Sequence, residues 1–348
     1  MTDTAYYLTP DSHYYLQAAQ NLLDGRGYRI YFQNKDTFCA IWPVGYSLLI
    51  AGVSFLTKLS VELSSKVVNL LAVAGILLLI YRQYKIQSWF VALALLSSSF
   101  LQLYANTWSE TVFVFCMLGF CFNYNQKNNS NWAFAVAAFL TRYIGFFLIV
   151  PLIVQRKYKV AFVFSVFIGL YLLNNYAQTQ TFTGDHGHFP TEPFATRLIR
   201  GLEGIGQEIA FWGVRDWDLK SGNEVLIFFI YGISALQAAI LVVTVKIIIN
   251  NKTTVVLSPI SSGIFVVAGS YFLTTILLYL FDDSIESLYF RRLSPVTLLL
   301  LIGSLGWLTE WPQRQIFDRV KWWVVAFFAL SVVHALPKMS IFEFINKQ

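Results

Sequence analysis

Side chains that could carry out chemistry are few in this sequence, and the first of them, Asp11, lies near the start of the chain. Thr9 is expected to cap a helix, with Pro10 in its first position and Asp11 in its first turn, and the glycines of Asp24-Gly25-Arg26-Gly27 are expected to end it. The helix dipole favours the carboxylate there, and Tyr14 and Tyr15 follow three and four residues later on the same face. Asp11 either completes this cap and does no more, or supplies a carboxylate that can accept a proton.

The other candidate charges stand next to long apolar runs. Glu110 opens one run, Arg142 falls within another, and Arg291 and Arg292 precede a third. A guanidinium group stays charged and binds phosphate oxygens in a fork, so an arginine here could hold a phosphate. The alternative for the two adjacent arginines is that they reach lipid headgroups. Because neighbours on a helix point in different directions, we expect one of them to take each role. Glu110 could equally be an exposed residue at a helix start.

The elements that must position these side chains are membrane-spanning helices. Hydrophobic residues make up 56% of the 348 residues and charged residues 13%, and the mean hydropathy is +0.56; a soluble domain carries about 25% charged residues. Repeated apolar runs match the ~20 residues that a helix needs to cross a bilayer, and they are apolar on all faces, unlike barrel strands. We therefore expect an all-α, polytopic membrane protein with about ten transmembrane helices. The clearest runs are 66–81, 89–104, 111–124, 132–154, 160–177, 225–249, 255–281, 293–308 and 322–336.

The basic residues indicate membrane orientation. The net charge is +6, but Lys and Arg are scattered among short loops, so we expect membrane lipids and no nucleic acid as partners. The loops predicted to be cytoplasmic carry Arg82, Lys85, Lys127, Arg156, Lys157, Lys159, Lys246, Lys252, Arg314, Arg319 and Lys321. The outer segments are then 1–65, 108–110, 179–224 and 282–292. All the candidate charges described above lie on or next to this outer face.

Loop parity holds only with two irregular segments. Run 132–154 must make two short passes that meet near Thr141 and Arg142, which also moves Arg142 away from the bilayer centre, where a charge costs about 2.5–3.5 kcal/mol. Segment 42–59 is apolar enough to cross, but crossing would invert every later loop, so we expect it to lie on the outer membrane surface. The chain is then a single domain, 1–348. It comprises a first outer loop with two helices (1–65), transmembrane helices (66–178), an outer loop (179–224) and further transmembrane helices (225–348).

Several short motifs, in one order, resemble the GT-C superfamily of integral membrane glycosyltransferases. D-S-x-x-Y from Asp11 is followed by A-x-x-L-x-x-G-x-G-Y from Ala19 and by W-P-x-G-Y from Trp42. This series is similar to the first outer loop of those enzymes, which include protein O-mannosyltransferases, lipid A aminoarabinose transferases and bacterial cell-envelope transferases. The later matches are Ser109-Glu110, Thr141-Arg142, Thr183-Gly184 and Arg291-Arg292-Leu293-Ser294-Pro295.

The resemblance implies transfer of a sugar from a polyprenyl-phosphate donor to a glycan, lipid or protein acceptor, on the outer face of a bacterial inner membrane. In such enzymes the acid of the first loop acts as general base on the acceptor hydroxyl, or binds a divalent metal ion that assists it, and Asp11 is the matching position. Glu110 matches a second carboxylate. Arg292, or its neighbour Arg291, would bind the phosphate of the leaving group. Arg142 would be a second phosphate contact or the partner of an outer-loop acid.

Other polar and aromatic residues are expected to bind the substrate. Asp185, His186 and His188 could be interpreted as a metal site, but no third and fourth ligands are within reach along the sequence, so we expect them to shape the acceptor pocket. The three cysteines show no metal-type spacing and predict no disulfide framework. The aromatic residues placed to stack on a sugar are Tyr14, Tyr15, Trp42 and Tyr46.

One element of the GT-C pattern is missing, and two other functions remain open. GT-C enzymes begin with a transmembrane helix, but no apolar run precedes Asp11, so the usual first helix is missing from the pattern. Either the true start of the protein lies upstream, or the later helices translocate the N-terminal segment, or the protein is a truncated relative. A transporter or flippase of lipid-linked sugars would also be polytopic and bind phosphate, but it should place ionisable residues at mid-membrane in two related halves. A noncatalytic scaffold would leave the charges dispersed in the fold.

Overall fold

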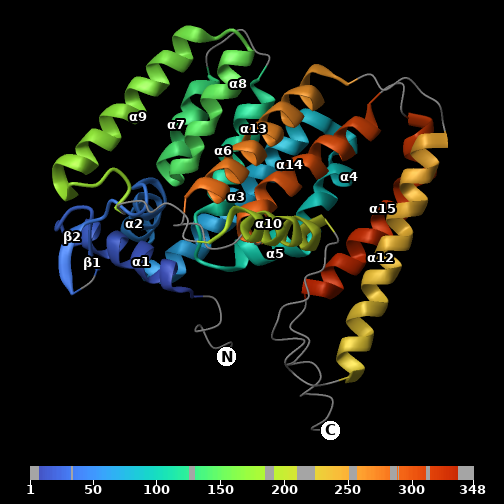
Figure 1. Cartoon of the computed structure of the whole chain (residues 1–348), viewed down its shortest axis with the longest axis horizontal. Helices are drawn as coiled ribbons and strands as arrows, with labels where there is room; N and C mark the ends of the chain where they lie inside the picture. Colours follow the sequence, from blue (N-terminus) through green and yellow to red (C-terminus); the bar gives the residue numbers. More distant parts are fainter. Residues whose placement is uncertain are drawn as a thin grey trace.

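The computed structural model describes residues 8–32, 34–124, 130–184, 192–209, 224–250, 257–282, 288, 290–310 and 314–335. Figure 1 shows a bundle of helices in which α3, α6, α7, α13 and α14 are central and α9 lies at one edge. The pair α12 and α15 lies at the opposite edge. The central helices are α3 (Val61–Tyr84), α6 (Glu110–Phe122), α7 (Asn131–Thr141), α13 (Pro259–Phe281) and α14 (Phe290–Thr309), and the outer ones are α9 (Tyr158–Thr179), α12 (Glu224–Asn250) and α15 (Arg314–Ala335).

The first helix begins and ends where the sequence predicts. Helix α1 (Pro10–Leu23) has Thr9 as its N-cap, and the backbone N–H of Thr9 donates to the hydroxyl of Ser12 at 3.0 Å. The chain leaves the helix through Gly25, whose φ of +73° is open to glycine but strained for other residues. The predicted cap and glycine stop are therefore confirmed.

A β-hairpin follows α1, whereas only helices were expected in this region. Strands β1 (Arg29–Phe32) and β2 (Lys35–Phe38) pair antiparallel, with Ile30 opposite Thr37. Ile30 is fully buried beneath α1 while the next residue, Tyr31, is 56% exposed, which is the two-residue alternation of a strand. The alternation covers only four residues in each strand and is flanked by turn residues, so it was too short to predict a strand from the sequence.

Helix α2 (Gly45–Thr57) corresponds to the segment expected on the membrane surface. Its 13 residues span about 20 Å, which is less than the ~30 Å hydrocarbon core. Alone it is too short to cross, as the loop parity requires; its lying along the membrane stays a prediction.

Five of the described helices are long and apolar enough to cross a membrane, and a sixth span results if a bent pair is counted as one. The protein is therefore mostly helical and its apolar helices indicate a membrane-embedded chain, but the count of about ten spans is not confirmed. The candidate spans are Val61–Leu96, Tyr158–Thr179, Tyr231–Asn250, Pro259–Phe281 and Arg291–Thr309, and the bent pair is α5 (Ser98–Ala105) with α6, at 118°.

Two of the predicted runs that do not form spans show why the count is lower. Run 89–104 is divided among α4 (Ser88–Ala92), a 3₁₀ turn at Leu93–Leu96 and α5, none of which is long enough to cross. Run 322–336 lies in α15, a helix of 22 residues that is not among the candidate spans. Its first two turns carry the charges of Arg314, Asp318, Arg319 and Lys321.

The break expected within run 132–154 is confirmed. Helix α7 ends at Arg142, whose extended backbone (φ −151°, ψ 131°) is followed by a 3₁₀ segment (Tyr143–Leu148) and by α8 (Ile149–Val154). The returning chain passes so close to α7 that a Cβ atom on Gly145 would lie 2.6 Å from the backbone nitrogen of Phe139. Only glycine fits at that contact, and the reversal leaves Arg142 at the joint between the two passes.

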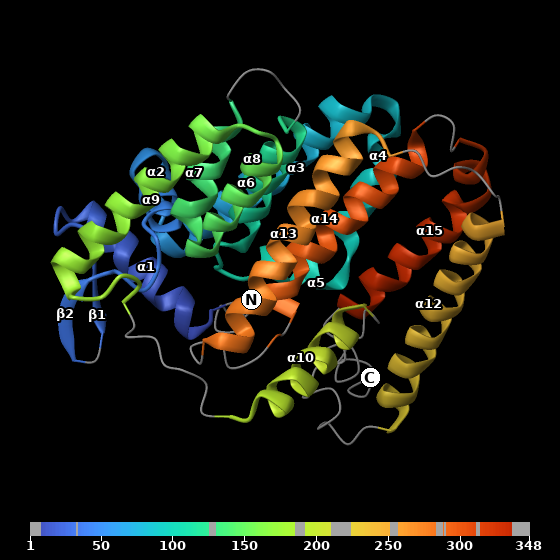
Figure 2. The ribbon, with the colours of Figure 1, turned by 45° about the horizontal axis from the view of Figure 1, so that its top comes forward.

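The predicted outer loop 179–224 contains a helix that the sequence analysis missed. Helix α10 (Phe194–Ile209) packs against α13 and α14 (Figure 2). Arg197 anchors it, because the buried guanidinium donates from Nε to the carbonyl oxygen of Tyr279 at 3.1 Å. A Cβ on Gly204 would lie 1.9 Å from the carbonyl oxygen of Leu288, so glycine permits this close packing.

Candidate functional site

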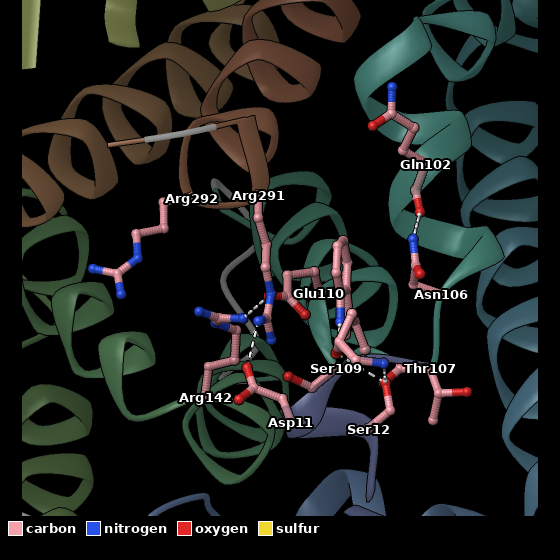
Figure 3. A network of polar contacts seen from close by, with 12 residues as sticks. Asp11, Ser12, Gln102, Asn106, Thr107, Ser109, Glu110, Arg142, Arg291 and Arg292 are labelled. Atoms are coloured by element: carbon pink, nitrogen blue, oxygen red, sulfur yellow. Dashed lines mark hydrogen bonds and ion pairs between the residues drawn. The ribbon is translucent and has the colours of Figure 1, made fainter. Parts of the chain in front are cut away.

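Arg291, in the first turn of α14, joins two acids from distant parts of the chain. Its Nη1 pairs with Oδ2 of Asp11 in α1, and its Nε pairs with Oε1 of Glu110 at the start of α6 (Figure 3). The partners lie 280 and 181 positions earlier in the sequence. Residues from three motifs that are far apart in the sequence therefore lie together in the folded chain.

Glu110 is the most buried member of this ion network. Its side chain has no exposed surface, and its Oε1 also pairs with Nη1 of Arg142 at the break after α7. The side chains of Arg291, Arg142 and Asp11 are 10%, 21% and 31% exposed. Two carboxylates and two guanidinium groups thus neutralise each other, and removing one member of such a buried set typically costs about 3–5 kcal/mol.

The turn before α6 fixes the network from one side. The guanidinium carbon of Arg291 lies 4.6 Å from the ring centre of Trp108, in cation–π contact, and Nε1 of Trp108 donates to Oγ1 of Thr9 at 2.8 Å. The hydroxyl of Ser12 donates to the carbonyl oxygen of Thr107 at 3.0 Å. The cap of α1 and the start of α6 are therefore held together around Asp11.

Polar residues buried in α3 explain why the chain bends sharply between α5 and α6. The side-chain amide of Asn69 donates to the carbonyl oxygens of Tyr104 and Asn106, at 3.0 and 2.7 Å. The hydroxyl of Ser65 lies 2.9 Å from that of Thr107. These contacts satisfy the backbone groups that the bend releases, so the turn carrying Glu110 has a fixed geometry.

The two adjacent arginines of α14 diverge, as expected. Figure 3 shows Arg291 directed into the acidic cluster and Arg292 directed away from it. Arg292 is half-buried, and its carbonyl oxygen accepts a hydrogen bond from the hydroxyl of Tyr271 at 3.1 Å. Of the three arginines proposed to bind phosphate, Arg142 and Arg291 are paired with acids.

The aromatic residues expected to stack on a sugar divide into two kinds. Tyr15 and Tyr46 are 1% and 0% exposed, so the prediction that their rings face a ligand is wrong. The hydroxyl of Tyr15 lies 3.1 Å from that of Ser109, and burial raises the pKa of this phenol above its ordinary value, so it stays neutral. Tyr14 and Trp42 are half-buried and stack on each other, with ring centres 5.3 Å apart. These two rings form a partly open aromatic wall.

Some predicted site residues are placed differently from expectation, and others lie outside the described residues. Glu110, the second carboxylate that the resemblance implies, has no exposed side-chain surface, because α6 is packed on all sides. Asp11 and Glu110 each pair directly with Arg291. Asp185, His186 and His188 lie outside the described residues. The preceding Gly184 (φ +75°) packs against Ile41, next to Trp42.

Sequence reasoning missed the residues that hold the network in place. Trp108 and Thr107 make the contacts described above, yet each looks ordinary in the sequence, and Ser12 was noted only as part of the D-S-x-x-Y motif. The one available signal was the polar Asn-Thr-Trp-Ser-Glu stretch between apolar runs, in which a Trp precedes an acid.

All three cysteines are buried free thiols, and burial raises the pKa of Cys39.

The exposed part of the ion network is suited to proton transfer. Asp11 is the partly exposed carboxylate, oriented by Arg291 through one oxygen, and it lies on the same helix as Tyr14 of the aromatic wall. A hydroxyl placed against this carboxylate could lose a proton to it. Comparison of the chain with protein-family models, with curated proteins and with solved structures found no match in any of the three.

Proposed function

We propose that this chain is a GT-C type glycosyltransferase that moves a sugar from a polyprenyl-phosphate donor to an acceptor on the non-cytoplasmic face of the membrane. One observation carries the proposal. Asp11 and Glu110 both pair with Arg291, although the three residues come from separate motifs resembling that superfamily and are far apart in sequence. A scaffold without activity has no need to gather ionisable groups from α1, α6 and α14 in this way. The host membrane we infer is a bacterial inner membrane.

Asp11 is the general base in this proposal. The acceptor hydroxyl oxygen attacks the anomeric carbon of the sugar while the bond from that carbon to the phosphate oxygen breaks. The hydroxyl proton passes to Asp11, and the polyprenyl phosphate leaves with the bonding electron pair. Arg291 orients Asp11, and such a positioned base typically contributes 10²–10⁴ in rate.

Arg292 is the residue we assign to the leaving phosphate. It lies one position from Arg291 in the sequence, and Figure 3 shows its guanidinium directed away from Asp11 and Glu110. A fixed cation stabilises the negative charge that develops on the phosphate. Arg142 and Glu110 then act as positioning residues, because each holds another member of the network.

A divalent metal at Asp11 fits the geometry less well. The guanidinium of Arg291 pairs with Oδ2 of Asp11, and a second cation beside it would be repelled. In this proposal Asp11 itself accepts the proton.

The test compares product formation with movement of the donor. The purified full chain is placed in vesicles with a radiolabelled polyprenyl-phosphate sugar and an extract of bacterial envelope acceptors. We expect labelled product, and Arg292→Ala should raise the Kd for the donor about tenfold or more, since a charge-assisted contact is lost. Arg319→Ala, in α15, is the matched control. Translocation of the donor across the vesicle membrane without any glycosylated product would instead establish the transporter alternative.

A further inference from the structure

A second buried acid lies away from the ion network, near the end of α10. Glu208 is 6% exposed, and the hydroxyl of Ser99 in α5 donates to its Oε2 at 3.2 Å. Its Oε1 is buried and has no hydrogen-bond partner among the described residues. Buried polar atoms are nearly always partnered, so an orphaned carboxylate oxygen points to a group that completes it.

Glu208 forms part of the wall of a cavity of about 230 Å³ between α10, α13 and α14. Apart from Thr297, the other lining residues are aliphatic, aromatic or glycine, among them Ile205, Phe272 and Leu293. Since a water molecule takes about 30 Å³ in the liquid, the space equals roughly seven or eight waters. It suits a short apolar chain with about as many heavy atoms.

The helix that carries Glu208 also has an exposed apolar face. Helix α10 exposes Leu198, Ile199 and Leu202, which are 42%, 58% and 60% exposed. Its buried side carries Arg197, Gly201, Gly204 and Glu208. Such an exposed apolar face is typical of helices that lie in the boundary between lipid and water, where a molecule dissolved in the membrane can approach α10.

The charge of Glu208 decides which end group the ligand carries. It is the one ionisable residue among those lining the cavity, and burial raises its pKa to about 7, so the carboxylate form is available near neutral pH. A pure hydrocarbon chain would fill the cavity but leave Oε1 without a partner. A primary ammonium supplies both the missing N–H donor and the opposite charge, and charge-assisted hydrogen bonds are about twice as strong as neutral ones.

We propose that this cavity binds an apolar chain ending in a primary ammonium group, which donates a hydrogen bond to Oε1 of Glu208. The side chains of Thr297 and Ser99 also hydrogen-bond to the carboxylate of Glu208. The site shares no residue with the ion network of Asp11, Glu110 and Arg291, so it does not rest on the proposed sugar transfer.

The experiment measures binding of n-octylamine and of 1-octanol, its neutral analogue, to the full chain in nanodiscs of uncharged lipid. Equilibrium dialysis at pH 8 uses empty nanodiscs as the blank. We expect octylamine to bind at least tenfold more tightly than octanol. Glu208→Gln should lower the affinity for octylamine at least tenfold and leave that for octanol unchanged. Glu203→Gln, an exposed acid on the same helix, is the matched control and should change neither affinity.

A second variant tests the cavity itself. A Cβ atom on Gly269 meets nothing within 4 Å, so Gly269→Leu places its side chain in the open space of the cavity without a clash. It should weaken binding of both ligands, and it does not depend on Glu208→Gln folding. Equal affinities of wild-type protein for octylamine and octanol, or unchanged octylamine binding in either variant, would overturn the proposal.

Discussion

The guanidinium of Arg291 in α14 is paired with the carboxylate of Asp11 in α1, 280 positions earlier in the chain. Glu110 takes another edge of the same guanidinium, so three helices are fixed relative to each other at one point. Asp11 has the most exposed side chain of the network and Glu110 the least. The network therefore has an accessible end, where we place the chemistry, and a buried end that supports it.

Glu110→Gln should destabilise the protein strongly while keeping the shape of the side chain. It leaves the guanidinium groups of Arg142 and Arg291 without the carboxylate they share, and we expect a loss of about 3–5 kcal/mol. The midpoint of thermal unfolding in detergent measures it. Glu62→Gln, an exposed acid in the first turn of α3, is the control. Equal midpoints for the two variants would mean that the buried pairing contributes nothing.

Trp108→Phe and Trp108→Leu separate two contributions to the position of Asp11. Phe keeps an aromatic ring under Arg291 but loses the hydrogen bond to Thr9, whereas Leu loses both contacts. We expect sugar transfer to fall in the order wild type, Phe, Leu, with kcat affected more than KM because the donor phosphate site is untouched. A fall in donor affinity with unchanged kcat would place Trp108 in binding instead of positioning.

The exposure of the four aromatic residues predicts which of them contact the acceptor. Trp42→Ala should raise the KM for the acceptor, since Trp42 and Tyr14 form the partly open stacked pair. Tyr46→Phe should leave that KM unchanged and cost about 1 kcal/mol of stability, because its buried hydroxyl donates to Asn69 at 3.0 Å. Acceptor KM values from initial rates decide the matter, and a raised KM in Tyr46→Phe alone would reverse the assignment.

Glu208 should make stability depend on pH. Burial raises its pKa from about 4.5 in the unfolded chain to about 7 in the fold, so the folded state holds the proton over this interval. The contribution of Glu208 to the free energy of unfolding is fully present below about pH 4. It is lost as the pH rises towards and through 7, and the total loss is on the order of 3 kcal/mol. The other residues lining its cavity do not titrate. Unfolding midpoints at pH 5 and pH 8 should differ less in Glu208→Gln than in wild type, and an equal difference would contradict the raised pKa.

Local rules predicted the parts of the fold that depend on neighbouring residues. The cap at Thr9, the glycine exit at Gly25 and the break at Arg142 all follow from residue types within a few positions. The number of spans could not be obtained this way. Hydropathy of run 89–104 does not reveal that the chain is divided there into short helices, since that division depends on packing against α14 and α15.

The candidate site was predictable in its members but not in their roles. Charged residues beside apolar runs identified Asp11, Glu110 and the adjacent arginines. Burial then separated them, because Glu110 opens a helix packed on all sides whereas Asp11 lies at the edge of α1. Which arginine faces the acids depends on the rotation of α14 and cannot be read from two identical neighbours.

The most direct test of the central claim is the rate of sugar transfer by Asp11→Asn at saturating donor. Asn keeps the size and can still hydrogen-bond to Arg291, but it cannot take a proton, so the rate should fall by about 10² or more. The Kd for the donor should stay close to that of wild type. Asp24→Asn, at the other end of the same helix, should transfer sugar normally. A transfer rate in Asp11→Asn within tenfold of wild type would contradict the assignment of Asp11 as the base.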